Sequence, residues 1–64
     1  MLFTFYPCRA DGSSTALETF DCADDDGALN RAERVLAEHL SSVEVVVWQG
    51  ERRVGAVSRA ALPA

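Results

Sequence analysis

Two segments with strand composition flank one amphipathic helical segment, and this order most constrains how a chain of 64 residues folds. A domain of this size has room for one helix packed on one small sheet. The sequence therefore predicts an α+β fold of the ββαββ type, with one helix packed on a four-stranded, mainly antiparallel sheet. We assign residues 1–59 to this single domain. Residues 60–64 carry no pattern, and we expect them to fray as a C-terminal tail.

The first half of the chain has the pattern of a β-hairpin. Residues 2–6 are apolar, aromatic or β-branched, which is typical of a strand. The Asp-Gly pair at positions 11–12 favours a tight turn, and a second strand is expected over roughly residues 15–22. Leu17 and Phe20 fall on opposite faces of a regular strand, so either a bulge corrects the parity or one of them faces outward.

The middle of the chain predicts an amphipathic helix. Asp24 is the expected N-cap, and the two acidic residues that follow lie favourably at the positive end of the helix dipole. The apolar residues fall within an arc of about 140°, as a helix that covers a core requires. These residues are Ala28, Leu29, Ala32, Val35, Leu36 and Leu40.

The second hairpin combines a strand over residues 43–48 with a strand over residues 52–58, joined by a tight turn at Gly50. Two positions of this turn are possible, but both leave the same side chains facing the helix. The residues expected on this inner face are Val43, Val45, Val47, Val54 and Ala56. The order of the four strands in the sheet stays open, because either the inner or the outer strands of the two hairpins can be neighbours.

The opposite face of the second hairpin is more apolar than a solvated sheet requires. It is expected to carry Glu44, Val46, Trp48, Arg53 and Val57. The three apolar members form a candidate patch, and Arg53 is expected to lie near Trp48, a pair enriched at interfaces. We therefore predict Val46, Trp48, Arg53 and Val57 as interaction residues of a homodimer, formed through this sheet face or through an edge strand.

The charge balance argues against a nucleic-acid partner. Six basic residues against ten acidic ones give a net charge of −4, whereas binding to phosphate requires a positive surface. The alternative is a nucleic-acid-linked regulator that inserts the hairpin bearing Arg52 and Arg53 into a groove. We treat this as the second hypothesis because only the local arginine pair favours it.

The two cysteines and the apolar segments bear on the compartment. Cys8 and Cys22 are out of register in a hairpin that turns at residues 11–12, so we expect free structural thiols. The start of the chain has no basic flank and only a short, broken apolar run, unlike a secretory leader. No segment approaches the length of a membrane span. These features predict a cytoplasmic protein without a membrane partner.

No pattern of catalytic, cofactor-binding or metal-binding residues emerges. His39 lies in the apolar arc, and we expect it to bond the last helix carbonyls or to cover the core edge. A small-ligand binder or enzyme that uses His39 is the third hypothesis. The acidic run at residues 21–26 is explained by helix capping, because it lacks the alternating oxygen ligands of a calcium loop. The expected function is a non-enzymatic protein-interaction or assembly module that needs no cofactor and no metal.

The segment from Val43 to Gly55, VEVVVWQGERRVG, resembles short uncharacterised bacterial proteins of the kind common in alphaproteobacteria. The opening Thr4-Phe5-Tyr6, the turn at residues 11–12 and the helix over residues 28–39 fit the same resemblance. It implies a domain of unknown function with a hairpin–helix–hairpin layout and a bacterial cytosolic origin. It implies no activity and no site residue.

Overall fold

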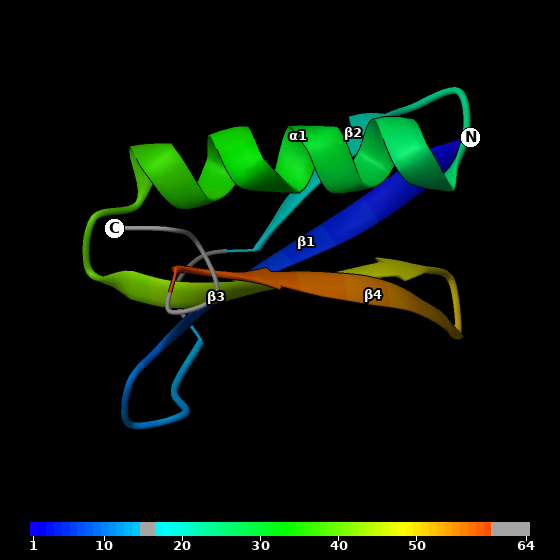
Figure 1. Cartoon of the computed structure of the whole chain (residues 1–64). Coiled ribbons are helices and arrows are strands. Elements are labelled where there is room, and N and C mark those ends of the chain that lie inside the picture. Colours follow the sequence, from blue (N-terminus) through cyan, green and yellow to red (C-terminus); the bar gives the residue numbers. More distant parts are fainter. Residues whose placement is uncertain (15–16, 60–64) are drawn as a thin grey trace.

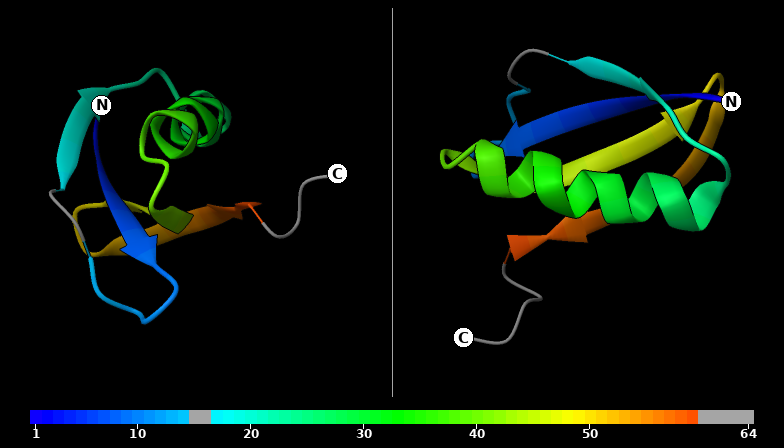
Figure 2. Two further views of the ribbon diagram at one scale, coloured as in Figure 1. Left: turned by 90° about the vertical axis from the view of Figure 1, so that its left-hand side faces the viewer. Right: turned by 90° about the horizontal axis from the view of Figure 1, so that it is seen from above.

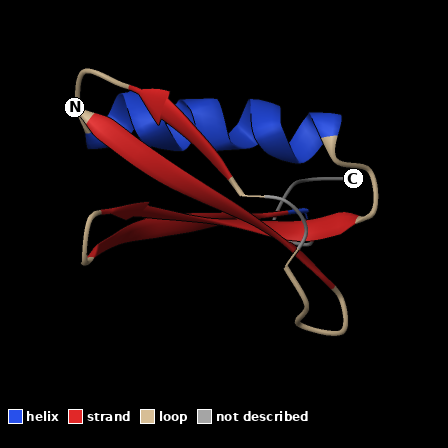
Figure 3. Ribbon diagram, turned by 180° about the vertical axis from the view of Figure 1, so that it is seen from behind, coloured by secondary structure: helices blue, strands red, loops and turns tan. Residues whose placement is uncertain are grey.

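The computed structural model describes residues 1–14 and 17–59, and it confirms the ββαββ order. The residues 15–16 that were assigned to the second strand, and the tail over residues 60–64, lie outside the described part of the chain. Helix α1 lies along one face of a four-stranded sheet (Figure 1), and the view from behind shows the same two layers (Figure 3). The elements are β1 (Leu2–Arg9), β2 (Glu18–Asp21), α1 (Asp25–Glu38), β3 (Ser42–Gln49) and β4 (Arg52–Ser58).

The strand order is β2-β1-β3-β4, and every neighbouring pair is antiparallel. The longest strands, β1 and β3, therefore lie in the centre, while β2 and β4 form the edges. Helix α1 connects edge strand β2 to central strand β3 and crosses one face of the sheet on the way (Figure 2). Among the described residues, no element covers the opposite face, which we call the outer face.

The core lies between α1 and the inner face of the sheet. Phe3 and Phe5 of β1 are fully buried. Because side chains alternate between the two faces along a strand, Thr4 and Tyr6 point to the outer face. Phe20 packs edge-on against Phe5, with 5.5 Å between the ring centroids. The other buried apolar residues come from the helix and from β3, and they are Ala28, Ala32, Val35, Leu36, Val45 and Val47.

The first hairpin and the start of the helix follow the sequence prediction. Phe3 pairs with Phe20, a register that places Leu17 at the surface with an exposed fraction of 55%. Asp24 is the N-cap of α1, and its Oδ1 accepts a hydrogen bond of 2.8 Å from the Gly27 amide. The prediction that Leu40 covers the core is wrong. The helix ends at Glu38, and Leu40 lies beyond it with 84% of its surface exposed.

Two irregularities in the ladders change which residues of the second hairpin face the helix. The register between β1 and β3 shifts between Cys8 and Arg9, so Ser42 is buried and Val43 is exposed, contrary to prediction. The register between β3 and β4 shifts after Val47. A bulge of this kind inserts one residue and reverses the parity of the strand beyond it.

The bulge in β4 overturns part of the predicted inner face. Gly55 pairs with Val47 and Val57 pairs with Val45, so both face the helix. Ala56 pairs with Val46 and lies on the outer face, where it is exposed, so its predicted inward position is wrong. Gly55 allows a close approach of the helix, because a Cβ atom at this position would lie 3.3 Å from the Leu29 side chain.

The C-terminal end of α1 is closed by two side chains. The last helical turn contains no basic residue. His39 provides the C-cap, and its Nδ1 lies 2.8 Å from the Val35 carbonyl oxygen. The guanidinium of Arg59, which follows β4, donates to the carbonyl oxygens of Leu36 at 2.6 Å and of His39 at 3.2 Å. These contacts add side-chain partners to the backbone hydrogen bonds that already reach the carbonyl oxygens at the end of the helix.

Candidate interaction surface

The outer face is organised in three rows of side chains that cross the central strands. The strand register pairs the residues of each row directly, and cross-strand partners in an antiparallel ladder share a face. The first row is Thr4, Trp48 and Arg53, the second is Tyr6, Val46 and Ala56, and the third is Cys8, Glu44 and Ser58. The middle row contains no charge, and each outer row contains one.

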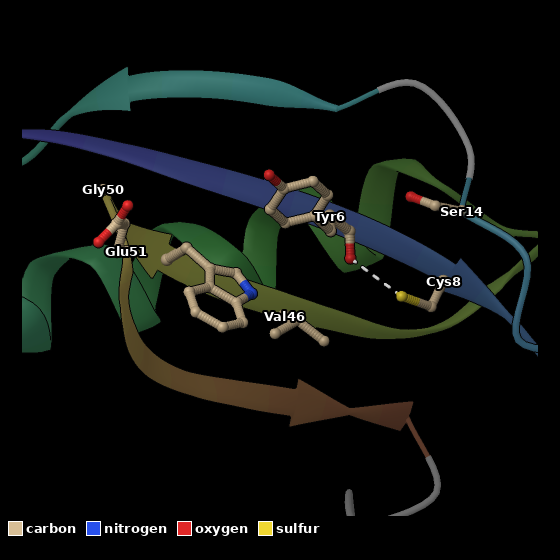
Figure 4. Close-up of a pocket in the computed structure, with 7 residues that line it drawn as sticks. Tyr6, Cys8, Ser14, Val46, Gly50 and Glu51 are labelled. Carbon is tan, nitrogen blue, oxygen red and sulfur yellow. Dashed lines mark hydrogen bonds between the residues drawn. The ribbon is translucent and has the colours of Figure 1, made fainter.

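A shallow hollow of about 550 Å³ opens on the outer face (Figure 4). Tyr6, Val46 and Trp48 form its apolar part, and all three side chains are half-buried. Figure 4 shows Gly50 and Glu51, at the turn of the second hairpin, at one end of the hollow and Cys8 at the other end. The lining residues are Tyr6, Cys8, Ser14, Val46, Trp48, Gly50 and Glu51. A hollow of this size accepts one or two side chains from an opposing surface.

Three of the four predicted interaction residues lie on the outer face. Val46 and Trp48 line the hollow, and Arg53 pairs with Trp48 across the strands. The placement of Val57 on this face is wrong, because the bulge turns its side chain toward the core. Tyr6 was not among the predicted interaction residues, although the alternation with buried Phe5 indicated its outward direction.

Arg53 and Glu44 are the charged residues within the three rows, and they lie at opposite ends. Arg53 is exposed, Glu44 is half-buried, and neither side chain forms a hydrogen bond or an ion pair with residues 1–14 or 17–59. Glu44 lies four positions before Trp48, the partner of Arg53, in β3. This separation corresponds to about 13 Å along the strand. The two charges are therefore too far apart to pair within one chain.

Arg53 lies beside Trp48 across the strands, as predicted, but the described residues show no cation–π contact between the two side chains. The cation–π contact that the structure contains joins Arg31 of the helix to Phe20, with the guanidinium carbon 3.9 Å from the ring centroid. This contact lies on the helix side of the sheet and fastens β2 to α1. Arg53 consequently remains available to a charge outside the chain.

Arg52, the other arginine of the second hairpin, is engaged with the helix. Its two terminal nitrogens donate to both carboxylate oxygens of Asp25 at 2.8 and 3.0 Å, and one of them also donates to Gln49. The hydrogen bonds from Arg52 lower the pKa of Asp25, and the same contacts raise the pKa of Arg52. Arg52 thus ties the hairpin to the first turn of α1 and does not project freely.

The remaining chemically active side chains have structural partners. The second ring nitrogen of His39 lies 3.6 Å from a carboxylate oxygen of Glu18. Both cysteines are free thiols. Cys22 packs against the core, and the Cys8 thiol donates to the Tyr6 carbonyl oxygen at 3.4 Å. In the described part of the chain, no three His, Cys, Asp or Glu side chains gather closely enough to hold a metal ion.

No protein-family model matches the chain, and neither a curated protein nor a solved structure shows significant similarity to it. None of the helical segments described has the length and apolar character needed to cross a membrane.

Proposed function

We propose that this chain is a small, non-enzymatic protein-interaction module that assembles as a homodimer through the outer face of its sheet. The observation that carries the proposal is the position of Tyr6, Val46 and Trp48. They line a hollow on the two central strands, on the face that no described element covers. Aromatic residues at such a position are typical anchors of an interface.

A second copy is the occupant that the surface suits best. A domain of 64 residues buries a small fraction of its surface, and such domains commonly gain stability from a partner subunit. An isologous dimer requires a patch that is complementary to itself. The outer face meets this requirement, because its apolar middle row lies between one positive and one negative residue. We place this assembly in the cytoplasm, where Cys8 and Cys22 would stay reduced.

Light scattering across a hundredfold concentration range tests the proposal. We expect the mass of a dimer at high micromolar concentration and a shift toward monomer in Trp48→Ala, because the substitution removes the largest apolar group of the face. Leu40→Ala is the matched control. It also truncates an apolar side chain, but Leu40 is 84% exposed and lies beyond the helix, away from the outer face. A monomer at every concentration, or equal effects of both variants, would contradict the proposal.

The two alternative functions receive less support from the contacts. The nucleic-acid hypothesis requires free arginines at the second hairpin, but Arg52 is bound in two directions by Asp25 and Gln49. The hypothesis of an enzyme or ligand binder requires a group of polar residues around His39. The neighbours of its ring are a helix carbonyl and Glu18, which suit a structural cap.

A further inference from the structure

The charge pattern of the outer face bears on how two copies would be oriented. Arg53 lies in the row that also contains Trp48, and Glu44 lies two rows away at the other end of the strands. Neither side chain has an ionic partner among the residues described. We propose that the homodimer has a two-fold axis in the plane of the interface and perpendicular to the strands, so that Arg53 of each protomer pairs with the partner's Glu44. This inference rests on the proposed function.

The direction of the axis follows from the charges. Two sheets that face each other can be related by an in-plane axis along the strands or by one across them. An axis along the strands places the same ends of the two sheets over each other. Arg53 then lies near Arg53 of the partner, and Glu44 lies near the partner's Glu44. An axis across the strands superimposes opposite ends and brings unlike charges together. Like charges in an interface are unfavourable, which selects the second arrangement.

The geometry of sheet packing allows both ion pairs to form. With the axis through the middle row, the row of Trp48 lies over the partner's third row. Arg53 is then displaced from the partner's Glu44 by about one strand spacing of 4.8 Å. Packed sheets are separated by about 10 Å, and extended arginine and glutamate side chains together span this distance. The uncharged middle row, Tyr6, Val46 and Ala56, then meets its own symmetry mate at the centre.

Charge reversal with mixing tests this arrangement. In a homodimer of the Glu44→Arg variant, each Arg53 faces a second arginine on the partner. In a homodimer of the Arg53→Glu variant, each Glu44 faces a second glutamate. Both variants therefore place like charges together at two sites of the interface. We expect each variant alone to raise the dimer Kd about tenfold or more. In an equimolar mixture, a mixed dimer contains one protomer that is positive at positions 44 and 53 and one that is negative at both. Each contact between position 53 and the partner's position 44 then joins opposite charges. The mixture should therefore return to within about threefold of the wild-type Kd, and native mass spectrometry should show the mixed species as the dominant dimer.

The controls separate this inference from the proposed function. Glu33→Arg and Arg34→Glu make the same charge changes on exposed positions of the helix and should leave the Kd within about twofold. If a reversed variant fails to fold, Glu44→Gln and Arg53→Gln should each still raise the Kd and reduce its salt dependence. A wild-type dimer whose Kd is insensitive to the reversals, or whose mixture stays monomeric, overturns this arrangement and leaves the homodimer intact. A wild-type monomer overturns both proposals.

Discussion

Replacement of Arg59 by alanine should destabilise the domain more than the surface position of this residue suggests. The half-buried guanidinium donates three hydrogen bonds. Two go to the carbonyl oxygens of Leu36 and His39 at the end of α1, at 2.6 and 3.2 Å, and the third goes to that of Ser42 at the start of β3, at 3.2 Å. Its positive charge also lies at the negative end of the helix dipole. No basic residue lies in the last turn of the helix. The substitution therefore leaves the carbonyl oxygens of Leu36 and His39 with their backbone donors, the amides of His39 and Ser42, and without a charged side-chain donor.

The expected loss is about 1–2 kcal/mol. Hydrogen bonds from charged groups contribute about 1.5–3 kcal/mol each where they are shielded, but water replaces them in part at a half-buried site. Ordering the arginine side chain costs up to about 2 kcal/mol, which offsets a large part of the gain. In a domain of this size, the remaining 1–2 kcal/mol corresponds to a decrease in Tm of about 4–16 °C.

Thermal unfolding followed by circular dichroism measures this loss. Arg34→Ala is the matched control, because Arg34 is exposed on the helix and has no side-chain partner in the described part of the chain. Arg59→Lys should recover only part of the stability, since an ammonium group cannot reach the three carbonyls in the same fork geometry. A Tm of Arg59→Ala within about 1 °C of the control would refute the stabilising role of Arg59 at the end of α1.

Two further perturbations test other contacts of the fold. Gly55→Ala should leave the free energy of unfolding almost unchanged, because the end of the flexible Leu29 side chain can move aside. Gly55→Val should lower it by about 1–3 kcal/mol, because the larger side chain forces the helix away from β4. Denaturant unfolding measures both values. Arg52→Gln should raise the pKa of Asp25 toward its ordinary value, as followed by NMR titration. Because folding lowers this pKa, the contribution of Asp25 to stability is complete above its unfolded pKa and is lost as the pH falls through its folded pKa. The variant should lose this dependence, and an unchanged titration of Asp25 would contradict the role of Arg52.

The features that local sequence determines were predictable. The composition of residues 2–6 predicted the first strand, and the turn at residues 11–12 predicted a hairpin register that the structure confirms. Asp24 identified the start of the helix because an N-cap depends on one side chain and the amides that follow it. The end of the helix was less predictable. The contact of His39 with a helix carbonyl was predicted, but the second donor at this end, Arg59, is 20 residues distant from His39 in sequence, and no local pattern connects them.

The sequence left the strand order open because each hairpin has its own turn and its own strand pairing, and neither shows which of its strands lies beside the other hairpin. The central contact between β1 and β3 joins segments about 40 residues apart and depends on the whole core. The same contact also determines the composition of the outer face. It places Tyr6 beside Val46, so the hollow requires residues from both hairpins, whereas the sequence showed the apolar pattern of each hairpin separately.

The bulge after Val47 gives the outer face its charge pattern. In a regular strand, Arg53 and Val57 lie on the same face, because they are an even number of positions apart in the sequence. The inserted residue breaks this relation, so Arg53 stays outward beside Trp48 while Val57 turns inward and packs against the core. Within the three rows, the outer face thereby loses one apolar side chain and keeps Arg53 at one end, with Glu44 at the other. A surface that is apolar throughout would allow many relative orientations of two copies, but separated opposite charges favour one.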